Sequence, residues 1–279
     1  ILTALPLYHI FAFTVNMLSF YWLGARNILI PNPRPLTNLK RAFENYKITW
    51  MSGVNTLFNG LNNEVWFRRS PPKHMKFAGA GGMALQGAVA QRWREVTGTD
   101  VLQGYGLTET SPVLTFEPVG KAREGTIGIP VPSTEVAVFD DKGKQLPIGE
   151  VGEIGARGPQ VMKGYWKKPE ETAATMVDDW FLTGDIGVME EDGYIRIVDR
   201  KKDMILVSGF NVYPNDVEDV IATHPGVLEV AVIGVPDEAS GEAVKAFIVA
   251  ADKTLPKSNA GKILRKDLRA EELAQIAAE

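Results

Sequence analysis

Cysteine is absent from the 279 residues of this sequence. Its absence excludes disulfide bonds, thiolate nucleophiles and thiolate metal sites, and it fits a reducing compartment such as the cytoplasm. Only three histidines are present, His9, His74 and His224, and they lie too far apart in the sequence to suggest a histidine metal site. The chain also lacks a GxxxxGK[ST] loop, a GxSxG elbow and an HExxH motif.

Charge of one sign is not in large excess. Lys and Arg total 30 against 34 Asp and Glu, so the net charge is −4, and we expect no nucleic-acid partner. The hydrophobic share of 45% and the charged share of 23% exclude a disordered, collagen-like or polytopic membrane protein. The mostly apolar residues 10–23 are shorter than the ~20 residues of a membrane span and include Asn16 and Ser19. We predict a buried core helix there.

The first hundred residues alternate between helix and strand patterns. Apolar residues recur at helical spacing over 36–46 and 84–97, and a further helix is expected from Thr56. Short apolar segments that predict strands lie between them, at 48–51, 74–78 and 101–104. Strands separated by helices predict an α/β fold with a parallel sheet covered on both faces. The apolar start, without Met or a leader, suggests that the chain begins within a domain.

The pattern changes after residue 126. Short alternating segments at 134–139, 152–157 and 194–198, separated by turn sequences, predict a mostly β region. A charged run at 199–203 then interrupts the hydrophobic pattern, and we place a domain boundary at 200–203. The remaining sequence predicts a small α+β domain, with strands at 204–207, 227–235 and 243–249 and helices from Pro214 and Lys262.

The most specific segment for chemistry is 103–110, which follows a predicted strand. Gly104 and Gly106 allow a ligand to approach the backbone, and Tyr105 offers a flat face to a base. Thr108 offers a hydroxyl to a phosphate oxygen, and Glu109 offers a carboxylate suited to Mg²⁺ that is held mainly by phosphates and water. The alternative is a glycine-rich turn in which Thr108 caps a helix.

Three weaker segments add polar groups that a nucleotide could use. Residues 79–84 match the loose dinucleotide pattern G-x-G-x-x-A and equally fit a loop against adenine or a plain tight turn. Asp185 ends a predicted strand and suits a vicinal diol such as ribose, with Arg200 in reach, although a surface turn is the simpler explanation. Lys262 follows Gly261 and could bring a point charge to a phosphate, or it could simply begin a helix.

Taken together and in order, these segments resemble the adenylate-forming superfamily, and within it the bacterial long-chain fatty-acid–CoA ligases. The segments that carry the resemblance are 5–9, 79–82, 105–109, 180–185, 199–203 and 256–265. Two further stretches, 158–166 and 203–214, are similar to the fatty-acyl branch. The resemblance spans nearly the whole chain.

The resemblance implies roles for individual residues. Tyr105 and the loop formed by Gly79, Ala80, Gly81, Gly82 and Met83 would line the adenine, Asp185 and Arg200 would hold the ribose, and Thr108 and Glu109 would bind the α-phosphate and Mg²⁺. Lys202 would be the hinge and Lys262 the adenylation lysine. Gly209 would line the pantetheine channel, His9 would lie beside the acyl carboxylate, and Phe13 would gate the fatty-acid tunnel.

The implied fold is a large domain of parallel sheets, helices and a small β-barrel part, here the latter part only (1–201), and a small mobile lid domain (202–279). The implied reaction activates a fatty acid with ATP and Mg²⁺ to acyl-AMP and then forms a thioester with CoA. Its small-molecule partners are fatty acid, ATP and CoA. The implied location is cytoplasmic, with room for peripheral contact at the inner face of the membrane and for a homodimer.

Two departures from the family pattern qualify the resemblance. The family's Ser/Thr/Gly-rich phosphate loop would precede residue 1, and without it we expect poor ATP binding. The family also has a helix and a strand where this chain has residues 252–253, and without them we expect exposed apolar faces at Val232 and Ile248. Two other functions stay open: a fatty acyl-AMP ligase or carrier-protein loader without CoA, and a non-catalytic nucleotide-binding module.

Overall fold

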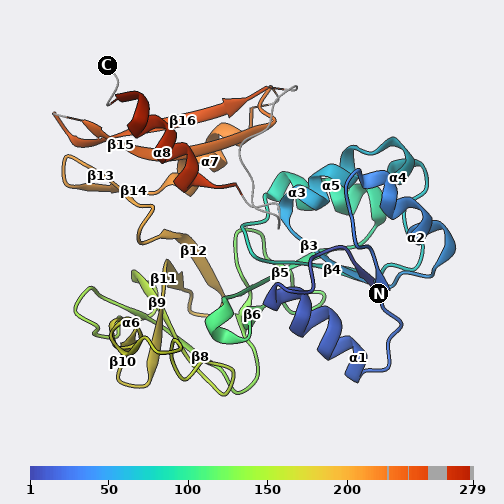
Figure 1. The fold of residues 1–279 in the computed structure, drawn as a ribbon, viewed down its shortest axis with the longest axis horizontal. Helices are drawn as coiled ribbons and strands as arrows, with labels where there is room; N and C mark the ends of the chain where they lie inside the picture. Colours follow the sequence, from blue (N-terminus) through green and yellow to red (C-terminus); the bar gives the residue numbers. More distant parts are fainter. Residues whose placement is uncertain (225, 238, 251–262, 277–279) are drawn as a thin grey trace.

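The computed structural model describes residues 1–224, 226–237, 239–250 and 263–276 (Figure 1). Its largest sheet has the order β2-β1-β3-β4-β5-β6-β7. The first five strands are parallel: β1 (Leu2–Thr3), β2 (Ile28–Leu29), β3 (Trp50–Gly53), β4 (Phe77–Ala80) and β5 (Val101–Gly106). The predicted parallel α/β sheet is therefore confirmed, although β6 (Val113–Phe116) and β7 (Ile129–Pro130) extend it in the antiparallel sense.

Helices cover this sheet on both sides. Figure 1 shows α3 (Asn55–Asn63) and α5 (Gly87–Thr97) on one side and α1 (Phe20–Trp22) on the other. The 3₁₀-helix Leu36–Leu39, α2 (Lys40–Asn45) and α4 (Val65–Arg69) complete the helical layer. The core between α3, α5 and the sheet includes the fully buried Phe58, Phe67 and Trp93, whose rings contact one another. Gly98 ends α5 with φ of 71°, as its position after the helix predicted.

The prediction of a buried core helix over residues 10–23 is wrong. A π-helix, Ala12–Ser19, runs into α1, and of these residues only Ala12 and Asn16 are buried. Asn16 points inward because Thr3 and Ser52 give it partners, at 2.8 Å each. The apolar side chains consequently face outward: Met17, Leu18, Tyr21, Trp22 and Leu23 are all exposed. No helix within the described residues has the length and apolar character needed to cross a membrane.

The predicted β region forms a second sheet. It contains β8 (Glu135–Phe139), β9 (Val151–Arg157), β10 (Met176–Val177), β11 (Trp180–Met189) and β12 (Ile195–Arg200), with α6 (Pro169–Ala174) beside β10. Ile195 on β12 exchanges hydrogen bonds with Ile127 and Gly128, at 2.8 and 3.0 Å, so this sheet curves back toward the segment that enters β7. Leu114, Ile127, Val136, Ile154 and Ile195 form the core that this curvature encloses.

The last part of the chain is the predicted α+β unit. Its antiparallel sheet has the order β14-β13-β16-β15, from β13 (Ile205–Val207), β14 (Phe210–Val212), β15 (Glu229–Asp237) and β16 (Gly241–Val249). The helices are α7 (Pro214–Ala222) and α8 (Arg265–Ile276). The sequence did not predict β14. Of the two apolar faces expected to be exposed, Ile248 is 55% exposed, whereas Val232 is fully buried. Residues 252–253 lie outside the described residues.

Candidate nucleotide-binding cleft

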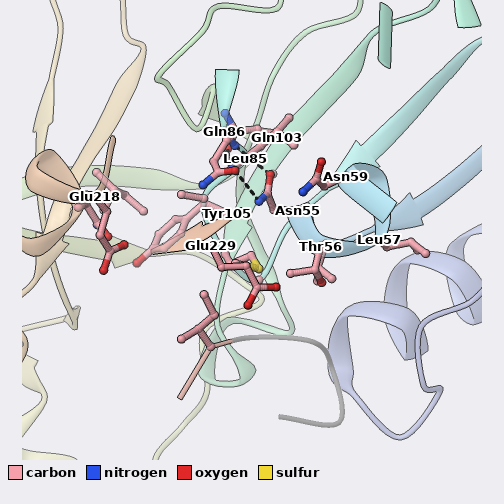
Figure 2. A pocket seen from close by; sticks show the side chains of 18 of the residues that line it. Asn55, Thr56, Leu57, Asn59, Leu85, Gln86, Gln103, Tyr105, Glu218 and Glu229 are labelled. Carbon is pink, nitrogen blue, oxygen red and sulfur yellow. Dashed lines mark hydrogen bonds between the residues drawn. The ribbon is translucent and has the colours of Figure 1, made fainter. Parts of the chain in front are cut away.

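A cleft of about 2160 Å³ lies where the three parts of the chain meet. Its walls come from the carboxyl ends of β3 and β5, from the first turns of α3, from the end of β12, and from α7 and β15. Open α/β sheets bind ligands beyond the carboxyl ends of their strands, so the position is the one that the fold favours. Figure 2 shows Tyr105 in the middle of this cleft, with Glu218 of α7 on one side and Asn55 and Thr56 of α3 on the other.

Tyr105 and Asp185 form the central polar pair of the cleft. The Tyr105 hydroxyl donates a 2.6 Å hydrogen bond to Asp185 Oδ2, and Arg200 Nε lies 3.4 Å from Asp185 Oδ1. Burial, reinforced by the neighbouring Asp185 carboxylate, raises the pKa of Tyr105 well above its ordinary value, so the phenol stays protonated and donates. The structure thus brings together three residues that the sequence analysis selected from segments up to 95 positions apart.

The β11–β12 pairing places Asp185 and Arg200 beside each other. The two residues are directly opposite in the antiparallel register, and a register shift on the β9 side of β11 lies between Leu182 and Ile186. Gly184, inside that irregular stretch, has φ of 76°, which favours glycine. Thr183 Oγ1 accepts from the Asp185 amide at 3.2 Å, so the backbone that carries the carboxylate is itself held.

The glycines of β5 are needed for packing as well as for ligand approach. A Cβ on Gly106 would lie 1.7 Å from the carbonyl oxygen of Pro112, and one on Gly104 would lie 2.8 Å from the Phe116 ring. Both residues line the cleft on either side of Tyr105. Their lack of side chains lets the antiparallel β6 pack against β5 while the edge of Tyr105 stays in the cleft.

Only part of the 79–83 loop reaches the cleft. Gly82, with φ of 79°, and Met83 line it, whereas Gly79, Ala80 and Gly81 are buried and do not. A Cβ on Gly79 would lie 2.9 Å from the Trp50 ring, so this glycine serves the packing of β4. The expected contact of residues 79–83 with a base stays a prediction, and in this cleft Gly82 and Met83 are the residues of the loop that could make it.

Thr108 and Glu109 lie just beyond Tyr105, in the 3₁₀-helix Thr108–Thr110, and neither lines the cleft as described. Glu109 Oε1 accepts a 2.9 Å hydrogen bond from the hydroxyl of Tyr165. Burial and the Glu109 carboxylate raise the pKa of Tyr165 to about 12, so it too remains a donor. Among the described residues no cluster of three or more His, Asp or Glu could hold a metal ion.

The remaining predicted residues are dispersed. Lys202 lines the cleft in the turn between β12 and β13, and Lys262 lies outside the described residues. Gly209 has φ of 84° in the turn between β13 and β14 and is not part of the cleft lining. His9 and Phe13 are exposed at the start of the π-helix segment, outside the cleft lining, where His9 Nδ1 accepts from the Phe11 amide at 3.2 Å.

Sequence motifs did not reveal the residues that hold the cleft walls in place. The Gln103 side chain accepts from the Leu85 amide at 3.1 Å and donates to the Thr126 carbonyl at 3.0 Å, so it joins the walls on both sides of β5. The backbone N–H of Gln103 donates to the carboxylate of the buried Glu117 at 2.7 Å. Across the cleft, Asn55 Oδ1 accepts from the Gln86 amide at 3.0 Å (Figure 2). Gln103 is the first residue of the 103–110 motif, and this position was the only indication in the sequence that it lies near the site.

Comparisons with known proteins agree with this geometry. A family model described as AMP-binding enzyme matches residues 1–166, and one described as AMP-binding enzyme C-terminal domain matches 216–278. The chain therefore belongs to the AMP-binding enzyme family. The long-chain-fatty-acid–CoA ligase of Yersinia pestis is 50% identical over 98% of this chain and 54% of its own length. The chain thus spans about half the length of the curated relatives it matches.

Two solved structures of one protein match this chain to different degrees. MatB from Rhodopseudomonas palustris, 32% identical, has a TM-score of 0.89 with ATP bound and 0.77 in its apo form. Each comparison covers 97% of this chain, and 59% and 60% of the respective MatB chains. The TM-score of this chain is thus higher to the ATP-bound MatB structure than to the apo structure.

Proposed function

We propose that the protein containing this chain is a long-chain-fatty-acid–CoA ligase. It would use ATP to convert a fatty acid into acyl-AMP and pyrophosphate, and then transfer the acyl group to the thiol of CoA with release of AMP. The observation that carries the proposal is the Tyr105–Asp185–Arg200 cluster at the carboxyl ends of the parallel strands, in a chain 50% identical to a ligase of that name.

The cleft supports a specific placement of the nucleotide. The adenine would lie against Tyr105 between Gly104 and Gly106, with Gly82 and Met83 at its other face, and the ribose hydroxyls would donate to Asp185. Thr108 would contact the α-phosphate and Glu109 the Mg²⁺. Bound Mg²⁺ supplies neutralisation of phosphate charge, and Tyr165 holds the Glu109 carboxylate in one orientation for it.

The remaining site residues are assigned by the family resemblance. Lys262 would bridge the acyl carboxylate and the α-phosphate, and His9 and Phe13 would lie on the acyl side. Residues 1–201 would form the large domain and 202–279 the small one, joined at Lys202. Rotation about Lys202 would withdraw Lys262 and bring the Gly209 turn to the cleft for CoA. Gly209 lies outside the cleft lining in this structure, which agrees with the orientation before that rotation.

Part of the family pattern has no counterpart in this sequence. The alignment with the Yersinia enzyme runs over 302 positions, more than the 279 residues here, so that relative carries residues with no counterpart in this chain. We place them near 252–253. The proposal also includes a cytoplasmic location with peripheral contact at the inner membrane face, which the proposed fatty-acid substrate suggests. A homodimer is the expected assembly, to be tested by sedimentation.

The proposal is tested by ATP–pyrophosphate exchange with the full-length gene product. We expect exchange that requires Mg²⁺ and a long-chain fatty acid, and a conversion of the product to acyl-CoA once CoA is added. Acyl-AMP that accumulates unchanged after CoA addition would instead indicate an acyl-AMP ligase or carrier-protein loader. Tight calorimetric binding of NAD without binding of ATP would indicate a non-catalytic nucleotide module and overturn the proposal.

A further inference from the structure

A partly buried polar cluster, here termed the hinge clamp, spans the turn at Lys202 and consists of Asp199, Asn215, Glu218 and Arg265. Asp199 belongs to the last strand of the second sheet, β12, and is fully buried. Asn215 and Glu218 lie on α7, and Arg265 is the first residue of α8. The clamp therefore joins the part of the chain before the turn to the part after it.

Asn215 makes the direct connection between the two sides. Its amide donates to Asp199 Oδ2 at 2.9 Å, so a carboxylate from β12 caps the N-terminus of α7. Its side-chain Nδ2 donates to the carbonyl oxygen of Val198 at 3.2 Å. Both bonds join α7 to β12, so they must break when α7 turns relative to that strand.

Arg265 fixes Asn215 in this position. Its guanidinium donates to Asn215 Oδ1 at 2.7 Å, and the same nitrogen lies 2.7 Å from Glu218 Oε1. Another nitrogen lies 3.5 Å from Asp199 Oδ1 and 3.8 Å from Asp203 Oδ2. Glu218 in turn accepts from the Val232 amide of β15 at 2.7 Å. One planar donor fork thus connects α8, α7 and β15 with β12, a geometry that Lys cannot reproduce.

We propose that Arg265 is a positioning residue that, through the hinge clamp, holds the small domain in the orientation seen here and must release Asp199 before the second orientation forms. The inference rests on the proposed function, because the two orientations matter through the two half-reactions. This chain has TM-scores of 0.89 to ATP-bound MatB and 0.77 to apo MatB, a difference that a change in domain orientation would produce.

The orientation is measured by single-molecule energy transfer between two dyes. The absence of cysteine from these 279 residues makes paired substitutions such as Glu95→Cys on α5 and Asn211→Cys on β14, both at exposed positions, selective labelling sites. With the other cysteines of the full-length protein removed, we expect one dominant population without substrates. Arg265→Met and Asp199→Asn should each raise the ratio of the second population to the first about tenfold. Arg265→Lys, which keeps the charge but loses the fork, should have an intermediate effect.

The matched control is Glu272→Gln. Glu272 is also buried on α8, but its ion pair with Lys245 lies wholly within the small domain. We expect this variant to leave the two populations as in the wild type. Equal populations in wild type, Arg265→Met and Asp199→Asn would overturn the proposal, as would a shift in Glu272→Gln as large as theirs. Should Arg265→Met fail to fold, Asp199→Asn decides the comparison alone.

The activity measurement separates this inference from the proposed function. Arg265→Met should slow fatty-acid-dependent pyrophosphate exchange about tenfold while changing CoA-dependent consumption of supplied acyl-AMP by less than threefold. Equal losses in both steps would contradict a role in orientation. If the wild-type protein shows no exchange at all, the proposed function fails, and the dye measurement still decides whether the clamp sets the domain orientation.

Discussion

Asp185 is held by side chains from two other strands, and this arrangement determines what it can bind. Tyr105 reaches it from β5 and Arg200 from β12, so the carboxylate is oriented before any ligand enters. Asp185→Asn keeps the size of the side chain but removes the charge that, in the proposed placement, would accept hydrogen bonds from two ribose hydroxyls. Since hydrogen bonds to charged groups contribute about 1.5–3 kcal/mol, we expect AMP to bind at least about tenfold more weakly. Isothermal titration calorimetry with AMP measures this.

The control for that substitution is Asp179→Asn, just before the same strand. Asp179 is exposed and pairs with Arg157, away from the cleft lining. Removal of the Asp179 charge should leave the affinity for AMP unchanged. Equal affinities for the wild type and Asp185→Asn would contradict the ribose assignment.

Tyr165 is the partner of the proposed magnesium ligand. Tyr165→Phe removes the hydroxyl that donates to Glu109 at 2.9 Å, so the carboxylate loses its fixed orientation. We expect the Mg²⁺ concentration needed for half-maximal pyrophosphate exchange to rise several-fold, with little change in stability. Tyr194→Phe, which deletes a hydroxyl bonded to the Lys121 carbonyl at 2.7 Å, is the matched control. An identical Mg²⁺ dependence in both variants would refute the role of Tyr165.

The sequence analysis selected Tyr105 and Asp185, which meet in the cleft, but not the residues that hold the cleft walls. Both residues lie in short motifs that can be recognised by their residue types. The residues that hold the site are paired over long stretches of sequence. Tyr165 bonds to Glu109, 56 positions away, and Gln103 bonds to residues 14 to 23 positions away. Arg265 lies beside Asp199, 66 positions away. Such pairs are created by strand register and helix packing, which a single sequence does not specify.

At the scale of elements, Glu117 holds the loop that follows β6. It is buried, and its two oxygens accept from the amides of Gln103 and Arg123, at 2.7 Å each. Burial raises its pKa, an effect that these hydrogen bonds partly offset. A neutral amide can accept with only one atom, so Glu117→Gln leaves one buried N–H without an acceptor. We expect it to lose about 1–3 kcal/mol of unfolding free energy at pH 7.

The raised pKa of Glu117 makes the stability of the wild-type protein depend on pH in a definite direction. Because the folded pKa of Glu117 is higher than its unfolded value, the folded state binds the proton more tightly. Its contribution to stability is complete below the unfolded pKa, about 4.3, and is lost as pH rises through the folded value. Urea denaturation measures the free energy of unfolding at each pH. Between pH 4.5 and 7 this free energy should therefore fall less steeply in Glu117→Gln than in the wild type. A parallel decline in both proteins would contradict this account.

Most elements followed from periodicity, and the failures have physical causes. The helices α3, α5 and α7 and the strands β3, β4, β8 and β15 lie close to their predicted positions. The prediction for residues 10–23 failed because two buried polar side chains, Thr3 and Ser52, hold the Asn16 side chain inward, whereas composition alone favoured burial of the apolar face. The three-residue strand β14 is too short to produce a period of two.

At the scale of the whole molecule, the order of motifs indicated two domains and a boundary at 200–203. The structure has β12 ending at Arg200 in one sheet and β13 beginning at Ile205 in another. How the small unit sits against the rest could not be predicted, because it depends on contacts such as Asn215 with Asp199.

The two-orientation account predicts opposite effects for two lysines of the full-length protein. Lys262→Ala should reduce adenylation strongly while largely sparing acyl transfer from supplied acyl-AMP to CoA. Lys202→Pro should restrict the turn and block the CoA step while sparing adenylation. Each half-reaction is assayed separately, by pyrophosphate exchange and by AMP release. Equal loss of both steps in Lys262→Ala, or an intact CoA step in Lys202→Pro, would refute the corresponding role.

The central claim is that an acyl adenylate forms in this cleft and is then consumed by CoA. The most direct measurement is mass spectrometry of the full-length protein's reaction with ATP, Mg²⁺ and a long-chain fatty acid, sampled before and after CoA is added. We predict acyl-AMP and pyrophosphate in equal amounts before CoA, and acyl-CoA with AMP afterwards. ADP and phosphate as the nucleotide products, or acyl-CoA formed without acyl-AMP, would contradict the account.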